Sequence, residues 1–267
     1  MILEREGVAL NVTVEGQGTP VVLLHGHTLD MRVWDEVVPP LVEAGYRAIR
    51  YDQRGHGRSS SPPSGYRWGD HAADLAEVIN RLNVAPSHVV GLSKGGGIAL
   101  ELALRNPEFV RSLTLVAPLV PDFTLSDELM ESFRELARAI RTQGVQTALG
   151  ALWLTHPLLA SAAAIPGTRE RLEAMVNTFP AGEYLAAERD APDRTWKVTD
   201  RLGEIAVPTL VVSGEHDIPD FVAMAALLAE KVPGSVLEVI QACGHLVPLE
   251  QPQEANEALL RFLQAQG

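Results

Sequence analysis

Cysteine, positive charge and long apolar runs are all scarce in this sequence. Cys243 is the one cysteine among 267 residues, so no intrachain disulfide can form, which fits a reducing compartment. The formal net charge is −12, and such an acidic chain is a poor partner for nucleic acid or an anionic membrane surface. The most apolar runs, 148–154 and 223–229, are too short to span a bilayer, and the charged residues at 4–6 leave no signal-peptide core. We therefore expect a cytoplasmic protein that binds neither nucleic acid nor membranes.

Common nucleotide and metal motifs are also missing. Lys94 precedes a glycine pair instead of following one, so the phosphate-binding pattern G-x-x-x-x-G-K-[ST] does not occur, and neither does G-x-G-x-x-G. A metallo-hydrolase pattern H-x-H-x-D-H beginning at His25 would need Asp and His where the chain has Leu29 and Asp30. We expect no metal and no cofactor, and we interpret His25 as a structural histidine that braces its loop.

Strand-like and helix-like segments alternate along most of the chain. Apolar residues make up 46% of the sequence and charged residues 21%, as in globular proteins. The helix at 70–82 is expected to bury Ala73, Ala76, Ile79 and Leu82. Short apolar or alternating runs predict strands within 2–15 and at 21–24, 46–51, 89–90, 110–116, 208–213 and 236–240; helical patterns lie at 34–44, 70–82, 98–104, 221–231 and 252–264.

A helical block interrupts this alternation. Residues 125–194 are rich in Ala and Leu and are broken only by Gly and Pro. Alternating strands and helices predict an α/β fold with a mostly parallel sheet and helices on both faces. We expect a core of residues 1–120 and 200–267, with residues 121–199 inserted as a helical cap over the carboxyl ends of the strands, where ligands bind in such sheets.

The pentapeptide Gly91-Leu92-Ser93-Lys94-Gly95 stands between a predicted strand and a predicted helix. A serine at a sharp strand-to-helix turn is held in a strained backbone conformation with its hydroxyl exposed. Glycines two residues away on either side allow the chain to pack closely around that turn. The pattern favours Ser93 as a nucleophile over an incidental serine in a glycine-rich turn.

Two later loops carry partners that a serine nucleophile needs. Gly214-Glu215-His216-Asp217 follows one predicted strand, and Ala242-Cys243-Gly244-His245 follows the next. Parallel strands would bring both loops to the sheet edge that carries Ser93. A histidine there can act as general base near neutral pH, and a carboxylate can fix its tautomer.

These motifs together resemble those of α/β-hydrolase-fold serine hydrolases over nearly the whole chain. The matching segments are His25-Gly26, Asp52-Gln53-Arg54-Gly55-His56-Gly57-Arg58-Ser59, Gly91-Leu92-Ser93-Lys94-Gly95-Gly96, Gly214-Glu215-His216-Asp217 and Gly244-His245. The resemblance implies Ser93 as nucleophile, Asp217 as triad acid and His245 as general base, with no cofactor. It extends to small carboxylesterases, enol-lactonases and cofactor-free perhydrolases. It predicts a hydrolase of small carboxylic esters or lactones that works through an acyl-enzyme.

Three alternatives to this function stay open on sequence. The fold also supports C–C bond hydrolases of ring-cleavage products and perhydrolases. A ligand-binding protein without turnover is a further alternative, which an intact triad disfavours. Two carboxylates compete with Asp217: Asp122 follows another strand, and Asp220 stands where a helix N-cap is expected.

The oxyanion hole and the pocket follow from the same arrangement. One backbone N–H is expected from Lys94, the residue after the nucleophile, and by resemblance the other comes from His27. The Lys94 side chain either points its amine away from the pocket to a nearby carboxylate or points inward, where it would favour a substrate that carries a carboxylate. We interpret Asp52, Arg54 and His56 as turn residues. Candidate pocket residues are Leu29, Phe133, Trp153 and Leu246.

Overall fold

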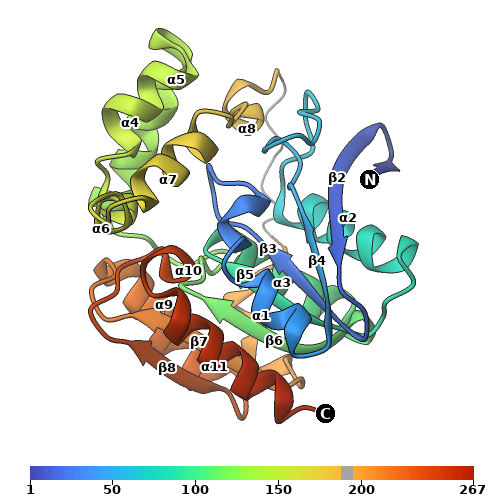
Figure 1. Cartoon of the computed structure of the whole chain (residues 1–267). Coiled ribbons are helices and arrows are strands. Elements are labelled where there is room, and N and C mark those ends of the chain that lie inside the picture. Colours follow the sequence, from blue (N-terminus) through green and yellow to red (C-terminus); the bar gives the residue numbers. More distant parts are fainter. Residues whose placement is uncertain (188–194) are drawn as a thin grey trace.

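A central eight-stranded sheet organises the protein, as the computed structural model in Figure 1 shows for the described residues, 1–187 and 195–267. The strand order is β1-β2-β4-β3-β5-β6-β7-β8. β1 and β2 form an antiparallel hairpin, β2 pairs antiparallel with β4, and the pairs from β4 through β8 are parallel. The strands are β1 (Ile2–Arg5), β2 (Val8–Glu15), β3 (Thr19–Leu24), β4 (Tyr46–Tyr51), β5 (Ser87–Leu92), β6 (Val110–Val116), β7 (Thr209–Gly214) and β8 (Val236–Ile240).

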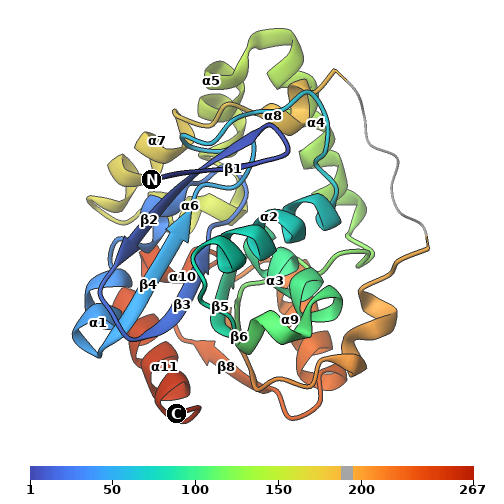
Figure 2. The ribbon, with the colours of Figure 1, turned by 90° about the vertical axis from the view of Figure 1, so that its right-hand side faces the viewer.

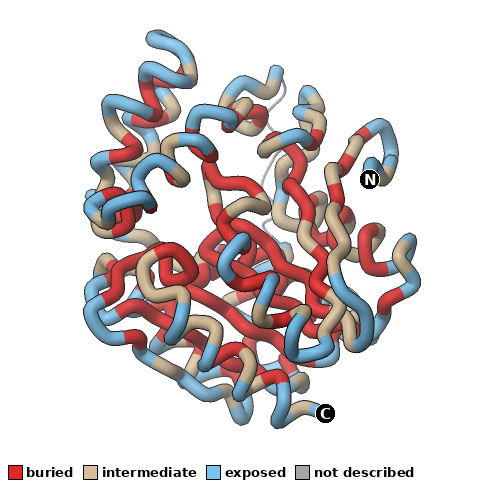
Figure 3. Tube along the Cα trace, viewed as in Figure 1, coloured by how far each residue is buried: buried red, intermediate tan, exposed pale blue. Residues whose placement is uncertain are grey.

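Helices cover both faces of the sheet (Figure 2). The pair α1 (Val38–Glu43) and α11 (Pro252–Gln264) lies on one face. On the other face lie α2 (Trp68–Arg81), α3 (Lys94–Arg105) and α9 (Pro219–Lys231). This arrangement confirms the predicted α/β class with its mostly parallel sheet. The core strands β3, β5 and β7 carry continuous apolar runs because both of their faces are buried, as the tube in Figure 3 shows.

The chain between β6 and β7 forms a layer of helices above the carboxyl ends of the strands (Figure 1). We call its described part, α4 to α8, the cap. Residues 188–194, the end of the predicted helical block 125–194, lie outside the described residues. The cap elements are α4 (Asp127–Gln143), α5 (Val145–Ala148), a π-helical turn η3 (Leu149–Trp153), α6 (Pro157–Ala163), α7 (Thr168–Val176) and α8 (Gly182–Leu185).

Local details refine the expected elements. In the helical pattern at 34–44, Pro39-Pro40 predicts a kink or a second start, and the segment is the 3-10 turn η1 (Met31–Trp34) followed by α1, whose first turn contains both prolines. A short helix that the sequence did not predict, α10 (Val247–Glu250), follows β8 and precedes α11. Two further 3-10 turns, η2 (Pro107–Phe109) and η4 (Thr199–Glu204), lead into β6 and β7.

The buried face of α2 also differs from the prediction. Ile79 is buried as expected, but Ala73, Ala76 and Leu82 are only partly buried. The helix is rotated so that Asp74 points into the protein, where both of its oxygens accept hydrogen bonds from Arg54 at 2.6 Å. The buried face of α2 thus includes Asp74, in its ion pair with Arg54, where hydrophobic spacing predicts only apolar residues. No helix within the described residues has the length and apolar character that a membrane span requires.

Candidate active site

Ser93 occupies a strained turn between β5 and α3. Its backbone has φ 52° and ψ −116°, which few residues with a side chain adopt. Close packing explains the glycines around it, because a Cβ on Gly91 would lie 2.3 Å from the Gly95 carbonyl oxygen. A Cβ on Gly95 would lie 2.4 Å from the Leu24 carbonyl oxygen. The turn presses against the end of β3, and α3 begins at the next residue, Lys94.

Asp217 and His245 meet at the same edge of the sheet. Nδ1 of His245 lies 2.9 Å from Oδ2 of Asp217, and both side chains are buried. Oδ1 of Asp217 accepts the backbone N–H of Ile218 at 2.7 Å, which fixes the carboxylate. The Phe221 ring packs edge-on against the imidazole, 4.2 Å between ring centroids. A carboxylate at Nδ1 favours the tautomer in which Nε2 is unprotonated and able to accept a proton.

Glu250 holds the loop that carries His245. Its Oε2 accepts the N–H of Gly244 at 2.7 Å, and its Oε1 accepts the N–H of Leu246 at 2.9 Å. One carboxylate therefore fixes the backbone on both sides of the histidine. Sequence reasoning missed Glu250, although an acidic residue five positions after a candidate base is a signal that could have been examined.

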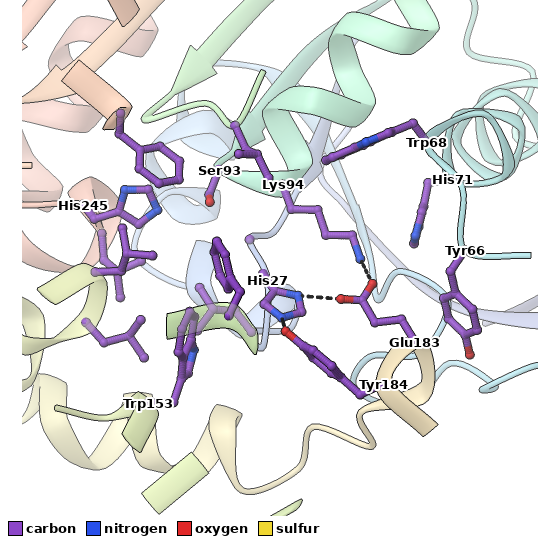
Figure 4. Close-up of a pocket in the computed structure, with 18 residues that line it drawn as sticks. His27, Tyr66, Trp68, His71, Ser93, Lys94, Trp153, Glu183, Tyr184 and His245 are labelled. Atoms are coloured by element: carbon purple, nitrogen blue, oxygen red, sulfur yellow. Dashed lines mark hydrogen bonds and ion pairs between the residues drawn. The ribbon is translucent and has the colours of Figure 1, made fainter. Parts of the chain in front are cut away.

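Ser93 and His245 line one cavity of about 280 Å³ beneath the cap (Figure 4). Trp153 is buried there and donates from Nε1 to Oγ1 of Thr28 at 2.7 Å. The centroid of its ring lies 5.7 Å from the ring centroid of Phe133, and Phe133 is half-buried. The wall includes the four residues that the sequence proposed for a pocket: Leu29, Phe133, Trp153 and Leu246.

The loop after β3 passes directly beside the serine. A Cβ built on Gly26 would lie 3.3 Å from the Cβ of Ser93. His27, the next residue, lines the cavity. Lys94 borders the cavity from the other side of the serine, at the first position of α3. The first backbone N–H groups of a helix have no acceptor inside the helix, and they attract negative charge.

Four side chains from the core and the cap form a network across this cavity (Figure 4). Nζ of Lys94 lies 2.5 Å from Oε2 of Glu183, and Nδ1 of His27 lies 3.3 Å from Oε1 of the same carboxylate. Nε2 of His27 is 2.7 Å from the hydroxyl of Tyr184. Burial outweighs the attraction of Glu183 and lowers the pKa of His27 to about 4, so the imidazole is neutral near pH 7.

Glu183 and Tyr184 were not predicted from the sequence. Both lie on α8, 89 and 157 positions from their partners Lys94 and His27. No local sequence pattern links residues so far apart, so these two contacts can be identified only from the three-dimensional structure. The amine of Lys94 pairs with the carboxylate of Glu183, but it does not point away from the pocket, because both residues line the cavity.

The two competing acids are engaged elsewhere. Asp122 accepts the N–H of Val198 at 3.0 Å through Oδ2. Asp220 was interpreted as an N-cap, and that is wrong, because the N-cap of α9 is Ile218. The Asp220 carboxylate instead accepts from the N–H and the hydroxyl of Ser126 at 2.6 and 2.9 Å, which fastens the start of α4 to α9.

The remaining polar motif residues hold loops together. Nε2 of His25 accepts the N–H of Gln53 at 2.9 Å. Asp52 accepts from the backbone N–H groups of Met31 and Arg58, at 3.0 and 2.9 Å. Nδ1 of His56 lies 3.0 Å from the Arg54 carbonyl oxygen.

Cys243 is buried beside the His245 loop. Burial, reinforced by nearby carboxylates, raises the pKa of its thiol to about 12, so it is a poor nucleophile. Among residues 1–187 and 195–267, no group of three or more His, Cys, Asp or Glu side chains is arranged to hold a metal ion.

Comparisons with known proteins agree with this architecture. Residues 19–252 match the family described as alpha/beta hydrolase fold. A putative non-heme chloroperoxidase from Synechocystis sp. is 30% identical, over 93% of this chain and 92% of that protein. An N-acyl homoserine lactone degrading enzyme, Est816, has a solved structure with a TM-score of 0.80 and 33% identity, covering 98% of this chain and 99% of its own. A thermophilic esterase from Thermogutta terrifontis has a TM-score of 0.83 and 28% identity, covering 99% and 97%. The chain belongs to the α/β-hydrolase-fold family of hydrolases.

Proposed function

We propose that this protein hydrolyses small carboxylic esters or lactones through an acyl-enzyme, with Ser93 as nucleophile, His245 as general base and Asp217 as triad acid. The hydrogen bond of 2.9 Å between His245 and Asp217 carries the proposal, because His245 also lines the cavity that contains Ser93. A serine hydroxyl needs such an adjacent base to react. The esterase and lactonase neighbours support the same substrate class.

In the first half of the reaction, His245 accepts the Ser93 proton as the serine oxygen attacks the carbonyl carbon. The carbonyl oxygen becomes an oxyanion, for which the N–H groups of His27 and Lys94 are the proposed donors. The imidazolium of His245, stabilised by Asp217, then protonates the departing alkoxide as the C–O bond breaks. An acyl group remains on Ser93.

In the second half, water takes the place of the alcohol. His245 removes a proton from the water, whose oxygen attacks the acyl carbon through the same oxyanion hole. Collapse of this intermediate returns the proton to Ser93 and releases the carboxylic acid. For a lactone, the alcohol and the acid are two ends of one product. The cap, as the described part of the proposed insertion 121–199, would enclose the substrate over the core formed by 1–120 and 200–267, with Leu29, Phe133, Trp153 and Leu246 as apolar walls.

Hydrogen peroxide can replace water in the second half, which would release a peracid. The relative from Synechocystis sp., named a putative non-heme chloroperoxidase, favours this as a second candidate activity. It uses the same acyl-enzyme and needs no other residue. Peracid formation from acetate and peroxide would therefore be lost with the same substitutions as ester hydrolysis.

The test is hydrolysis of p-nitrophenyl acetate, p-nitrophenyl hexanoate and N-hexanoyl homoserine lactone by the purified chain. We expect turnover of at least one of these compounds and its loss in Ser93→Ala. Ser235→Ala is a matched control, because Ser235 lies outside the cavity near the end of α9. Turnover that survives in Ser93→Ala, or activity on none of the three compounds, would contradict the proposal.

A further inference from the structure

The two ends of the cavity differ in chemistry. Beside His245 the cavity wall carries the apolar ring of Phe221, 4.2 Å from the imidazole between ring centroids, and Leu158 and Leu159 also line the cavity. The opposite end, beyond Ser93, is formed by Lys94, Glu183 and His71, with Tyr66 and Trp68 beside them (Figure 4). We call this second end the polar arm. A substrate carbonyl at Ser93 would thus have an apolar region on one side and the polar arm on the other.

The polar arm contains one positive and one negative charge held against each other. Nζ of Lys94 and Oε2 of Glu183 are 2.5 Å apart, and their side chains are 8% and 23% exposed. Burial disfavours the charged form of Glu183, but attraction to Lys94 outweighs it and holds the pKa of this carboxyl below its ordinary value. The two side chains form a salt bridge in which the opposite charges cancel. An ammonium has three N–H donors, so Lys94 can bond to a ligand while it stays paired.

His71 adds an uncharged group to the same wall. It is 1% exposed, and its Nε2 has no hydrogen-bond partner among the described residues. Burial, followed by repulsion from Lys94, lowers the pKa of His71 well below its ordinary value, so the ring is neutral. A buried polar atom without a partner is costly, and one in a cavity wall is available to a ligand.

A charged ligand group fits this arm poorly. A carboxylate beside Lys94 would also lie beside Glu183, and an ammonium beside Glu183 would lie beside Lys94. Either group would lose its hydration, and repulsion from the like charge of the pair would offset attraction to the opposite charge. An uncharged group that both donates and accepts can bond to Lys94, Glu183 and His71 without that repulsion.

We propose that the polar arm is a specificity subsite that binds an uncharged hydrogen-bonding group of the substrate, an amide or a hydroxyl, and rejects a carboxylate or an ammonium at that place. This inference rests on the proposed function, because it concerns the ester or lactone that Ser93 attacks. It revises the expectation that an inward Lys94 would favour a substrate carboxylate, since Glu183 cancels the charge.

The test compares amide and carboxylate substrates of nearly equal shape. On the acyl side, the probes are the p-nitrophenyl esters of adipamic and adipic acid and of suberamic and suberic acid. On the alcohol side, they are 4-acetoxybutyramide and 4-acetoxybutyrate. One of the two sides, acyl or alcohol, is expected to reach the polar arm. For the probes of that side, we expect kcat/KM for the amide to exceed kcat/KM for the carboxylate by about tenfold or more, the scale of one hydrogen bond to a charged group.

Single substitutions should then change the preference in opposite directions. Glu183→Gln leaves Lys94 unpaired, so the preference should shift by about tenfold or more toward the carboxylate. Lys94→Gln leaves Glu183 unpaired, so the carboxylate should be rejected even more strongly. Because each ratio is taken within one variant, a loss of rate common to both substrates cancels. Glu173→Gln on the cap surface, where Glu173 pairs with Arg169, is the matched control and should keep the wild-type ratio.

The outcomes separate the two proposals. Failure to hydrolyse any of p-nitrophenyl acetate, p-nitrophenyl hexanoate and N-hexanoyl homoserine lactone would overturn the proposed function, and the subsite with it. Hydrolysis of at least one of these compounds, with equal kcat/KM for amide and carboxylate on both sides, would overturn the subsite alone. A Glu183→Gln variant that loses activity on all substrates without a change in their ratio would also overturn it, because that result indicates a purely structural role.

Discussion

Nδ1 of His245 lies 2.9 Å from Oδ2 of Asp217, and this contact joins the loops that follow β8 and β7. Both side chains are buried, so water cannot easily replace the carboxylate as the partner of the imidazole. The backbone N–H of Ile218 donates to the Asp217 carboxylate and fixes it. Independently, the Glu250 carboxylate accepts two backbone N–H groups of the loop that carries His245. These contacts hold the pair in position in the free protein, as the proposed role of His245 as general base requires.

Replacing Asp217 with Asn should therefore lower kcat for p-nitrophenyl acetate by about 10⁴-fold, because an amide in this place favours the wrong imidazole tautomer. The measurement is steady-state kinetics on the folded variant. Asp122→Asn is the matched control, since Asp122 is bound to the backbone of Val198. If Asp122→Asn removed activity and Asp217→Asn did not, the triad acid would be Asp122.

The bond between Tyr184 and His27 predicts that the cap positions the loop after β3, in which His27 is a proposed oxyanion donor. Tyr184→Phe removes the partner of Nε2 of His27, at 2.7 Å, and leaves the ring of the tyrosine in place. We expect kcat for p-nitrophenyl acetate to fall by about tenfold with little change in KM, because a displaced oxyanion donor weakens the transition state more than the ground state. Tyr46→Phe, on β4 outside the cavity, should leave both constants unchanged. A rise in KM at unchanged kcat would contradict a positioning role for Tyr184.

Close packing at the serine turn predicts that its glycines tolerate no side chain. Gly95→Ala would force a Cβ to 2.4 Å from the Leu24 carbonyl oxygen, so the turn or β3 must move. We expect loss of activity and a thermal midpoint lower by several degrees, as for an overpacked core. Gly150→Ala is the matched control, because nothing lies within 4 Å of the added Cβ in this helical residue of the cap. Its stability should be unchanged or higher by about 0.5–1 kcal/mol.

Buried neutral histidines predict a loss of stability in mild acid. Burial lowers the pKa of His27 and of His88 from 6.5 to about 4. Between these values the unfolded chain binds more protons than the folded one, so the free energy of unfolding falls as the pH falls from 6.5 to about 4. We expect the thermal midpoint to drop by about 5 °C or more between pH 7 and pH 5.

His88→Gln should reduce this slope, whereas His216→Gln should not, because the His216 side chain is 67% exposed. Thermal unfolding followed by circular dichroism across this pH range provides the measurement. A midpoint that stays constant or rises on acidification would contradict the neutral state assigned to these buried rings.

Much of the core could be predicted from the sequence because its signals are local. Strands β4, β6 and β8 and helix α11 have the predicted bounds, since each is a regular pattern that ends at Gly, Pro or a polar loop. The motifs around Ser93, Asp217 and His245 are equally local, and parallel topology then brings their loops to one edge. The partners of the site are different. Glu183 contacts Lys94, and Tyr184 contacts His27, only because α8 folds back over the core, which no spacing in the sequence encodes.

The errors have a common physical source. On α2, the predicted buried face contained only apolar residues, but Asp74 is buried as well, through its ion pair with Arg54. Asp220 resembled a helix cap, yet its carboxylate binds Ser126 of another helix. In both cases a polar contact with a residue distant in the sequence determines where the carboxylate lies, and local sequence patterns do not reveal such a contact.

Formation of an acyl-enzyme on Ser93, with help from His245 and Asp217, can be measured directly. Rapid mixing with p-nitrophenyl acetate is followed by acid quench and peptide mass analysis. We expect a burst of about one p-nitrophenol per chain and an acetyl group on the peptide that carries Ser93, both absent in Ser93→Ala. A full rate without a burst and without acetyl on Ser93, or an acetyl group found on another residue of the cavity, would contradict this expectation.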